Sequence, residues 1–318
     1  MRLIMMGTGP FAVPTFRALL DSGHQVAVLV TRPSPAVRTR GKTPPNPMRE
    51  EADRRSVQVV APQDVNTETA RKQLASLRPD LLVVCDYGQI LAAATLAVAP
   101  LGGINLHGSL LPQYRGAAPV NWALLNGETE SGVTVLHMTP KLDAGPSLAQ
   151  RATPIGPDET ADQLEPRLAE LGLDAVREAI ELLQAWDGSS PIGTPQDTSL
   201  ATQARRLRKE DGQVDWSNSA ERIRNQVRAL KPWPGTFTHW KRGTRPPMRF
   251  ILEQVSVVLD SDQNEPGSVL KSDSGQLWIA TNDGILSIER LKPAGKRVME
   301  VAEFLRGHPI EAGARLGT

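Results

Sequence analysis

The sequence has very little cysteine: Cys85 is the single one in 318 residues. One cysteine excludes an internal disulfide and any zinc site built from several thiolates. Long hydrophobic runs are also absent, because no apolar stretch approaches the roughly 20 residues that cross a bilayer as a helix. The short run at residues 1–6 leads directly into a glycine turn and is too short for a signal peptide. We therefore expect a cytoplasmic protein with no membrane partner.

Internal repeats, low-complexity tracts and clusters of metal-ligand residues are absent as well. Four of the five histidines are isolated in the sequence, and for each of them a hydrogen-bonded or surface position is the better interpretation; they are His24, His137, His239 and His308. We expect no metal.

Acidic residues are missing from residues 31–49, which contain five prolines and five basic side chains. The basic residues are Arg32, Arg38, Arg40, Lys42 and Arg49. Such a segment has few ways to form regular structure, so we expect a positively charged loop. A loop without acids suits contact with phosphates, because each Lys or Arg there releases counterions.

Charge is also uneven along the chain, although the net charge is only +1. Residues 1–200 carry a net charge of −4, residues 201–250 of +8, and residues 251–318 of −3. A basic stretch of this kind indicates either an anionic partner such as nucleic acid or an ordinary solvated surface. Charge alone leaves both interpretations open.

The order of apolar segments predicts two domains in a chain of ordinary soluble composition, 40% hydrophobic and 22% charged. Alternating strands and helices predict an α/β parallel sheet in the first part, and short strands with glycine turns predict a small barrel in the second. A stretch rich in Ser, Gly, Pro and Thr separates them. We predict a catalytic domain over residues 1–188, a linker over 189–207 and a second domain over 208–318.

The first strand, expected at Arg2–Met6, ends in Gly7-Thr8-Gly9, which resembles a loose dinucleotide-binding fingerprint. That fingerprint needs an acidic residue at the end of the second strand, expected at Gln25–Val30, to bind a ribose hydroxyl. The sequence has Thr31 and Arg32 there instead. A tight turn near a substrate is therefore favoured over nicotinamide binding.

An amide, an imidazole and a carboxylate stand at two later strand ends. Asn105 and His107 are two residues apart at the end of an apolar run, so in a strand they project from one face. Gly108 and Pro112 bracket the turn that follows, and Asp143 comes after the strand expected at 133–138. Ligands bind at the carboxyl ends of strands in open parallel sheets. We therefore expect these three residues to line one crevice suited to acyl-type transfer.

The sequence around these residues resembles the methionyl-tRNA formyltransferases of the folate-dependent formyltransferase superfamily. The resemblance rests on Asn105-Leu106-His107-Gly108-Ser109-Leu110-Leu111-Pro112, Tyr114-Arg115-Gly116-Ala117-Ala118-Pro119 and Leu142-Asp143-Ala144-Gly145. Three further stretches narrow it to the tRNA enzymes: residues 40–45, 227–235 and 292–299. The chain departs from the family pattern at Ala144 and Pro146, where a threonine and a second aspartate are usual, and at Asp86, where a small residue is common.

The resemblance implies a Rossmann-like formyltransferase domain followed by an oligonucleotide-binding (OB)-like β-barrel. It implies an enzyme of translation initiation that transfers the formyl group of 10-formyltetrahydrofolate to the α-amino group of methionine on initiator tRNA. The expected folate-contact residues are Ser109, Leu110, Leu111 and Pro112, with Tyr87, Gly88, Gln89, Ile90 and Leu91 as a second wall. The expected tRNA-binding residues are Arg38, Arg40 and Lys42. We expect a monomer.

Asn105, His107 and Asp143 are the catalytic candidates. Our hypothesis is that the Asn105 amide and a protonated His107 stabilise the oxyanion of a tetrahedral intermediate. Asp143 would keep the imidazole charged and accept, directly or through water, the proton that the amine loses. Taken alone, His107 would be interpreted as a hydrogen-bonded or surface residue, like the other four histidines. The motif around it favours a catalytic role instead.

Two rival functions stay open on the sequence. A related folate-dependent formyltransferase or a formyl-folate hydrolase acting on a small molecule would keep the catalytic residues without needing a basic loop. A non-catalytic nucleic-acid-binding protein would use the barrel and residues 201–250, but an intact set of catalytic residues argues against it.

Overall fold

A computed structural model of the chain describes residues 1–34, 46–258, 264–273 and 275–317. Arg38, Arg40 and Lys42 lie outside the described residues. The chain forms two compact units. The first contains residues 1–119, 130–155 and 163–205, and the second contains residues 120–129, 156–162 and 206–318.

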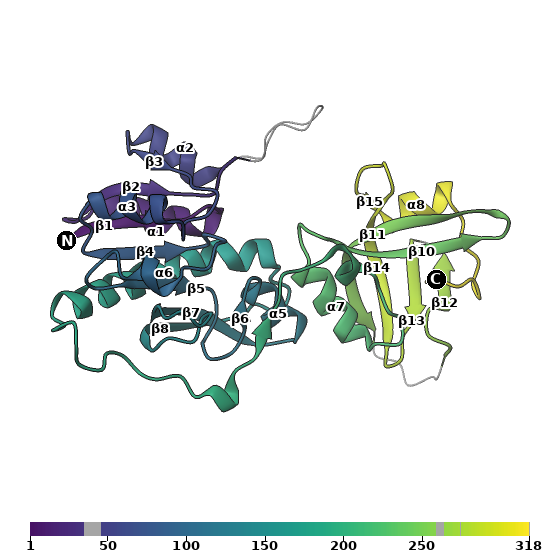
Figure 1. Cartoon of the computed structure of the whole chain (residues 1–318). Coiled ribbons are helices and arrows are strands. Elements are labelled where there is room, and N and C mark those ends of the chain that lie inside the picture. The colour runs from purple at the N-terminus through teal and green to yellow at the C-terminus, as the bar shows by residue number, and fades with distance from the viewer. Residues whose placement is uncertain (35–45, 259–263, 274, 318) are drawn as a thin grey trace. The chain divides into compact units, whose positions relative to one another are not determined.

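The first unit is built on a seven-stranded sheet with the order β3-β2-β1-β4-β5-β7-β8 (Figure 1). Its strands are β1 (Arg2–Met6), β2 (Gln25–Val30), β3 (Val59–Val60), β4 (Leu81–Cys85), β5 (Gly103–His107), β7 (Glu130–His137) and β8 (Ser147–Pro154). The five strands from β3 to β5 are parallel, whereas β7 and β8 are antiparallel to their neighbours. The predicted Rossmann-like α/β domain is confirmed, with an antiparallel edge that the sequence analysis did not specify.

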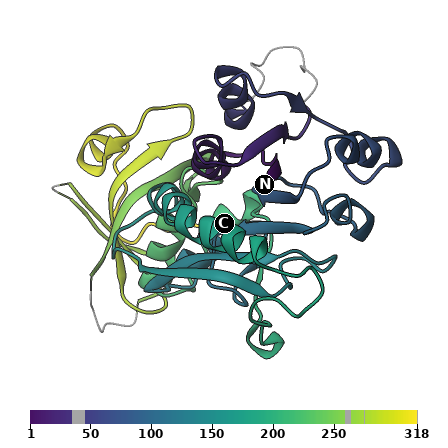
Figure 2. The same cartoon turned by 90° about the vertical axis from the view of Figure 1, so that its left-hand side faces the viewer.

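Helices cover this sheet. They are α1 (Val13–Leu20), α2 (Pro47–Arg54), α3 (Glu68–Ser76), α4 (Ala93–Leu96) and α6 (Ala161–Gln184), with short 3-10 turns at Pro10–Ala12 and Thr198–Leu200. Side-chain caps define two of the starts, because Asn46 accepts from the Arg49 amide and Thr67 accepts from the Ala70 amide. The long helix α6 lies along one face of the sheet (Figure 2).

The core of the first unit lies between the sheet and its helices. Alternate residues of β1, β2 and β4 point into one apolar cluster that also contains Val65, Leu74 and Tyr87. On α6, a side chain at Gly172 would meet Leu106 of β5 at 2.6 Å, so glycine lets the helix approach the strand closely.

The second unit is built on a curled antiparallel sheet in the order β10-β11-β14-β13-β12, with β15 paired to β14. Its strands are β10 (Thr236–Arg242), β11 (Arg245–Val258), β12 (Val269–Asp273), β13 (Gln276–Ala280), β14 (Ile285–Pro293) and β15 (Met299–Glu300). Its helices are α7 (Ala220–Ala229) and α8 (Val301–Gly307), with a 3-10 turn at Lys209–Gly212; α5 (Pro119–Leu125) lies almost entirely in this unit.

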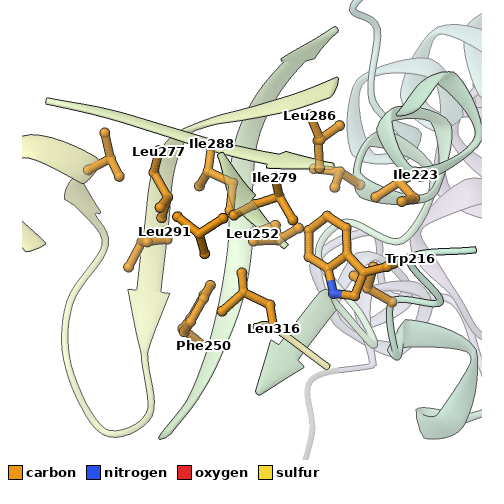
Figure 3. Packing of buried hydrophobic residues seen from close by; sticks show 14 of the residues in the cluster. Trp216, Ile223, Phe250, Leu252, Leu277, Ile279, Leu286, Ile288, Leu291 and Leu316 are labelled. Atoms are coloured by element: carbon orange, nitrogen blue, oxygen red, sulfur yellow. The ribbon is translucent and has the colours of Figure 1, made fainter. Parts of the chain in front are cut away.

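The core of the second unit gathers buried apolar side chains from β11, β12, β13 and β14 together with Trp216 (Figure 3). The Trp216 indole N–H donates to the hydroxyl of Thr238 at 3.1 Å, so its polar edge is satisfied inside this core. The predicted small OB-like β domain is confirmed.

Short elements escaped the sequence prediction: α4, α8, β15 and the two-residue strands β6 (Arg115–Gly116) and β9 (Gln203–Ala204). Elements of two to seven residues carry too few apolar repeats to show a period. β9 lies in the segment that we assigned to a linker and pairs in parallel with β6. The functional boundaries at residues 188 and 207 stay a prediction.

Within the described ranges, every helix is too short or too polar to cross a bilayer.

Candidate active site

Asn105 and His107 lie on one face of β5, at the end where the strand enters its loop. His107 is buried, and its Nε2 lies 2.9 Å from the carbonyl oxygen of Tyr114. A carbonyl oxygen only accepts, so Nε2 carries a hydrogen and donates to it. The nitrogen that remains for chemistry is Nδ1.

Asp143, on the loop after β7, is buried and joins three parts of the site. Its Oδ1 accepts from the Asn105 amide at 3.3 Å, and its Oδ2 accepts from the Gly116 backbone N–H at 2.9 Å. The same Oδ2 lies 3.8 Å from His107 Nδ1. The structure thus brings the three predicted catalytic residues together.

The backbone of this site is strained at both loops. Asp143 has φ of 48° and Tyr114 has φ of 61°, a left-handed conformation that non-glycine residues rarely adopt. Gly116, with φ of 127°, lies so close to β9 that an added Cβ would stand 2.5 Å from the Ala204 carbonyl oxygen. Such conformations persist only where surrounding contacts hold them, and they concentrate at functional sites.

Thr134 of β7 fixes the loop after His107 through its hydroxyl group. The Thr134 hydroxyl donates to Ser109 O at 2.7 Å and accepts from Leu111 N at 3.0 Å and from the Gln150 amide at 2.9 Å. Ser109 is itself buried, and its hydroxyl donates to Gln113 O at 2.7 Å. Ser109 and Leu111 are therefore structural parts of the loop, and their contact with folate stays a prediction, as it does for Leu110 and Pro112.

Residues 87–91, the second predicted wall, follow β4. Tyr87 and Leu91 are buried in the core, whereas Ile90 is 62% exposed. Gln89 is tied down by accepting from Val65 N at 3.0 Å and donating to Pro62 O at 3.2 Å. Gly88 has φ of 83° and lies under the side chain of Arg32. Ile90 is the member of this group whose side chain projects outward.

Asp86, the departure from the family pattern, connects the ends of β4 and β1. Its carbonyl oxygen accepts from Thr8 N at 3.0 Å and from Gly9 N at 3.4 Å. Its carboxylate lies against Gly9, where an added Cβ would stand 1.7 Å from Oδ2, so glycine is required beside it. Desolvation, with the nearby charge of Glu165, raises the pKa of Asp86 to about 7. Because β1, β4 and β5 are adjacent in the sheet, the strand ends at Gly7, Asp86 and Asn105 are neighbours.

Arg115 is buried, and its guanidinium binds the Oε1 of Gln196 through Nε at 3.1 Å and Nη2 at 2.7 Å. Through these contacts Arg115 fixes the loop in which it stands. Gln196 and the Gly116 amide were missed by the sequence analysis, because backbone donors and a side chain some fifty residues from Asp143 leave no local pattern.

Several basic residues between 201 and 250 are engaged within the second unit. Arg222 donates to Leu125 O, Arg224 forms ion pairs with Asp158 and Glu221, and Arg228 donates to Asn225. Part of the +8 net charge therefore has a structural role rather than serving an anionic partner.

No group of three or more His, Cys, Asp or Glu suited to a metal occurs among the residues that the structure describes. A cavity of about 440 Å³ is lined by the Leu111–Pro112 turn, by β8 and by residues 194–197.

Comparison with known proteins gives consistent matches. The formyl transferase family model matches residues 1–180, and the model of the formyl transferase C-terminal domain matches residues 206–309. A Rhodopirellula baltica protein named methionyl-tRNA formyltransferase is 48% identical, covering 99% of this chain and 96% of its own. A Geobacter sulfurreducens protein of the same name is 39% identical, covering 100% of this chain and 97% of its own.

Solved structures with the same fold are more distant in sequence. The N-formyltransferase from Helicobacter canadensis, in complex with folinic acid and dTDP-3-aminofucose, has a TM-score of 0.64 at 17% identity, covering 90% of this chain and 98% of its own. HypX from Aquifex aeolicus, in complex with tetrahydrofolic acid, has a TM-score of 0.58 at 19% identity, covering 96% of this chain and 47% of its own. At these identities the likeness concerns the fold alone.

Proposed function

Because this chain belongs to the formyl transferase family, and over its full length to the group of relatives named methionyl-tRNA formyltransferases, we propose that it formylates methionyl-tRNA. The formyl donor is 10-formyltetrahydrofolate, and the acceptor is the α-amino group of methionine on the initiator tRNA.

The observation that carries the proposal is the convergence of Asn105, His107 and Asp143 at one strand end, in a chain that matches those relatives over its full length. An amide donor, an imidazole and a carboxylate are what acyl transfer to an amine needs.

Formyl transfer makes one C–N bond and breaks another. The amine nitrogen attacks the formyl carbon, the formyl oxygen becomes an oxyanion, and the bond from that carbon to the folate nitrogen then breaks. The amine loses one proton and the departing folate nitrogen gains one. The protein therefore has to stabilise the oxyanion and to move a proton across the site.

The oxyanion has two donors available. Asn105 has a second amide N–H beyond the one directed at Asp143, and His107 has Nδ1 when the ring is protonated. Donors of this kind contribute about 10²–10³ in rate each. Asp143 stabilises the imidazolium by its charge and accepts the amine proton.

The folate contact rests on two exposed aliphatic side chains. Ile90 on the loop after β4 is 62% exposed, and Leu142, adjacent to Asp143, is 53% exposed. Exposed apolar groups on loops that follow strands of this sheet suit the ring system of a reduced folate. We assign the rings to these loops, together with the backbone of residues 87–91 and 109–112.

The tRNA is recognised by charge, with Arg38, Arg40 and Lys42 near its acceptor end and the second unit as a further binding surface. We further propose that the enzyme is cytoplasmic and acts as a monomer.

A formylation assay tests the function. The protein is mixed with 10-formyltetrahydrofolate and either charged initiator or charged elongator methionine tRNA. Formylation of the initiator alone is expected. Formylation of a free amino sugar or release of formate without tRNA would support the small-molecule rival instead, and binding of tRNA without turnover would support a non-catalytic protein.

A further inference from the structure

Gln196 connects the two loops that carry the catalytic groups. Its Nε2 donates to Asp143 O at 2.9 Å and to Gly145 O at 2.7 Å. Its Oε1 accepts from Arg115 Nε at 3.1 Å and Nη2 at 2.7 Å. All four hydrogen-bonding positions of one amide are thereby used, two toward each loop.

Each loop needs this support because each contains a strained residue. Asp143 and Tyr114 have φ of 48° and 61°, and such conformations persist only where surrounding contacts hold them. Without the Gln196 bonds, the Asp143 loop is free to relax toward an ordinary backbone conformation. That relaxation moves the carboxylate whose position the reaction depends on.

The residues on either side of Arg115 hold the catalytic side chains directly. Tyr114 O accepts from His107 Nε2, and Gly116 N donates to Asp143 Oδ2. A side chain that fixes both Arg115 and the Asp143 backbone therefore sets the distance between His107 and Asp143.

Other residues of the segment 193–204 support the same two sides of the site, mostly through their backbone. On the Asp143 side, Thr194 exchanges two backbone hydrogen bonds of 2.8 Å with Ser147, at the start of β8. Thr202 accepts from Tyr114 N at 2.8 Å through its hydroxyl and from Arg115 N at 2.9 Å through its carbonyl. Ala204 O accepts from Ala117 N at 2.7 Å. Gln196 adds the link from this segment to the Asp143 loop.

We propose that Gln196 is a positioning residue of the formyl transfer: it does not touch the substrates, and it holds Asp143 and the Tyr114–Gly116 turn in the arrangement that the reaction needs. This inference rests on the proposed function, and it explains how a chain with Ala144 and Pro146 keeps the Asp143 loop in place.

The test uses Gln196→Met, which keeps the side-chain length and removes all four hydrogen bonds. Its kcat for formylation falls roughly 10- to 100-fold, because small displacements of catalytic groups have effects of this size. KM values for folate and methionyl-tRNA are expected to stay within about threefold, because a positioning residue makes no contact with either substrate. Gln203→Ala is the matched control, because its side chain is exposed on β9 of the same segment.

A second variant separates the two ends of the amide. Gln196→Glu keeps the acceptors for Arg115 and loses the donors toward Asp143 O and Gly145 O. It is expected to be as slow as Gln196→Met. Wild-type kcat in either folded variant, a loss confined to KM, or an equal loss in Gln203→Ala would overturn the proposal.

Amide hydrogen exchange at Gly116 gives a readout that does not need turnover. Exchange is expected to be about tenfold faster in both Gln196 variants, because the bond from this N–H to Asp143 loosens. If the wild-type protein does not formylate tRNA, the proposed function fails, and the exchange experiment still decides whether Gln196 positions Asp143. Unchanged exchange would overturn the positioning role even if activity fell.

Discussion

His107 Nδ1 lies 3.8 Å from Asp143 Oδ2, beyond the range of a direct hydrogen bond. The carboxylate is meanwhile held by the Gly116 amide and the Asn105 side chain, and the imidazole by Tyr114 O. The two groups are thus close enough to interact by charge without neutralising each other through a shared proton. That spacing leaves Nδ1 available to a substrate oxygen.

His107→Ala is expected to lower single-turnover formylation by about 10²–10⁴, because it removes an oxyanion donor and the group that pairs with Asp143. The measurement is rapid-quench formylation at saturating substrates, with circular dichroism to check the fold. His24→Ala, which changes a histidine near the N-terminus, is the control and should keep wild-type activity. Near wild-type turnover in a folded His107→Ala would remove this residue from the mechanism.

Asp143→Asn should slow formylation roughly 100-fold or more, since it removes the charge that favours the imidazolium and the acceptor for the amine proton. The Asn side chain is close to the same size, so the loop should keep its backbone. Rapid-quench formylation at saturating substrates measures the rate, with circular dichroism to check the fold. A rate like that of the wild type would contradict both roles.

Gly116→Ala is expected to reduce stability by about 1–3 kcal/mol, because alanine is strained at φ of 127° and its Cβ would meet the Ala204 carbonyl at 2.5 Å. It also displaces the amide that binds Asp143, so activity should fall with stability. Urea unfolding gives the free energy of unfolding. Gly23→Ala is the control, because nothing lies within 4 Å of an added Cβ there.

Asp86 is expected to make stability fall as the pH rises. Its pKa is raised from 3.8 to about 7 by desolvation and by Glu165, so the unfolded chain ionises first and the folded form loses stability between these values. Asp86→Asn removes this loss. Its melting temperature, measured against the wild type, should therefore gain more at pH 8 than at pH 5. The gain is small in size because the side chain keeps contact with water.

Asp187 has a lowered pKa, so its effect on stability should depend on pH in the opposite direction. The Ser190 and Ser189 amides and the Ser190 hydroxyl donate to its carboxylate and lower its pKa to about 2. Its stabilisation is therefore present above about pH 4 and lost as the pH falls toward 2. Asp187→Asn should lower the melting temperature at pH 8, and this difference should shrink in acid. The same sign of pH dependence for both variants would contradict one of the two pKa shifts, and the variant whose sign differs from its prediction shows which.

Much of this arrangement was predictable from the sequence, and the reason is periodicity. β1 and β2 were predicted with the bounds that the structure gives, because each is a distinct apolar run. Asn105 and His107 were found because they stand at the carboxyl end of β5, in the parallel part of the sheet where ligands bind. Asp143 follows β7, which runs antiparallel to β5, so this rule does not account for its position beside Asn105. The structure adds the hydrogen bonds that these side chains form.

The parts that escaped prediction depend on backbone groups and on long-range contacts. The Gly116 amide has no side chain to reveal it, and Gln196 stands in a stretch whose Ser, Gly and Pro content resembles a linker. The antiparallel direction of β7 depends on the path of residues 108–129, which connect it to β5, rather than on the residue types within the strand. None of these three features can be inferred from the amino-acid composition of the segment in which it lies.

The last prediction concerns the basic loop. Changing Arg40 and Lys42 together to alanine should raise KM for methionyl-tRNA and leave KM for folate unchanged, because these residues would contact phosphates rather than the folate rings. The dependence of tRNA binding on salt should also become shallower, with the slope of log K against log salt reduced by roughly 0.7–0.9 for each phosphate that the variant no longer neutralises. Filter binding across a salt series measures this slope. Asp53→Asn on α2 is a charge-changing control in the same part of the chain. Equal losses for both substrates would place the loop at the folate site instead, and an unchanged slope would exclude phosphate binding by these two residues altogether.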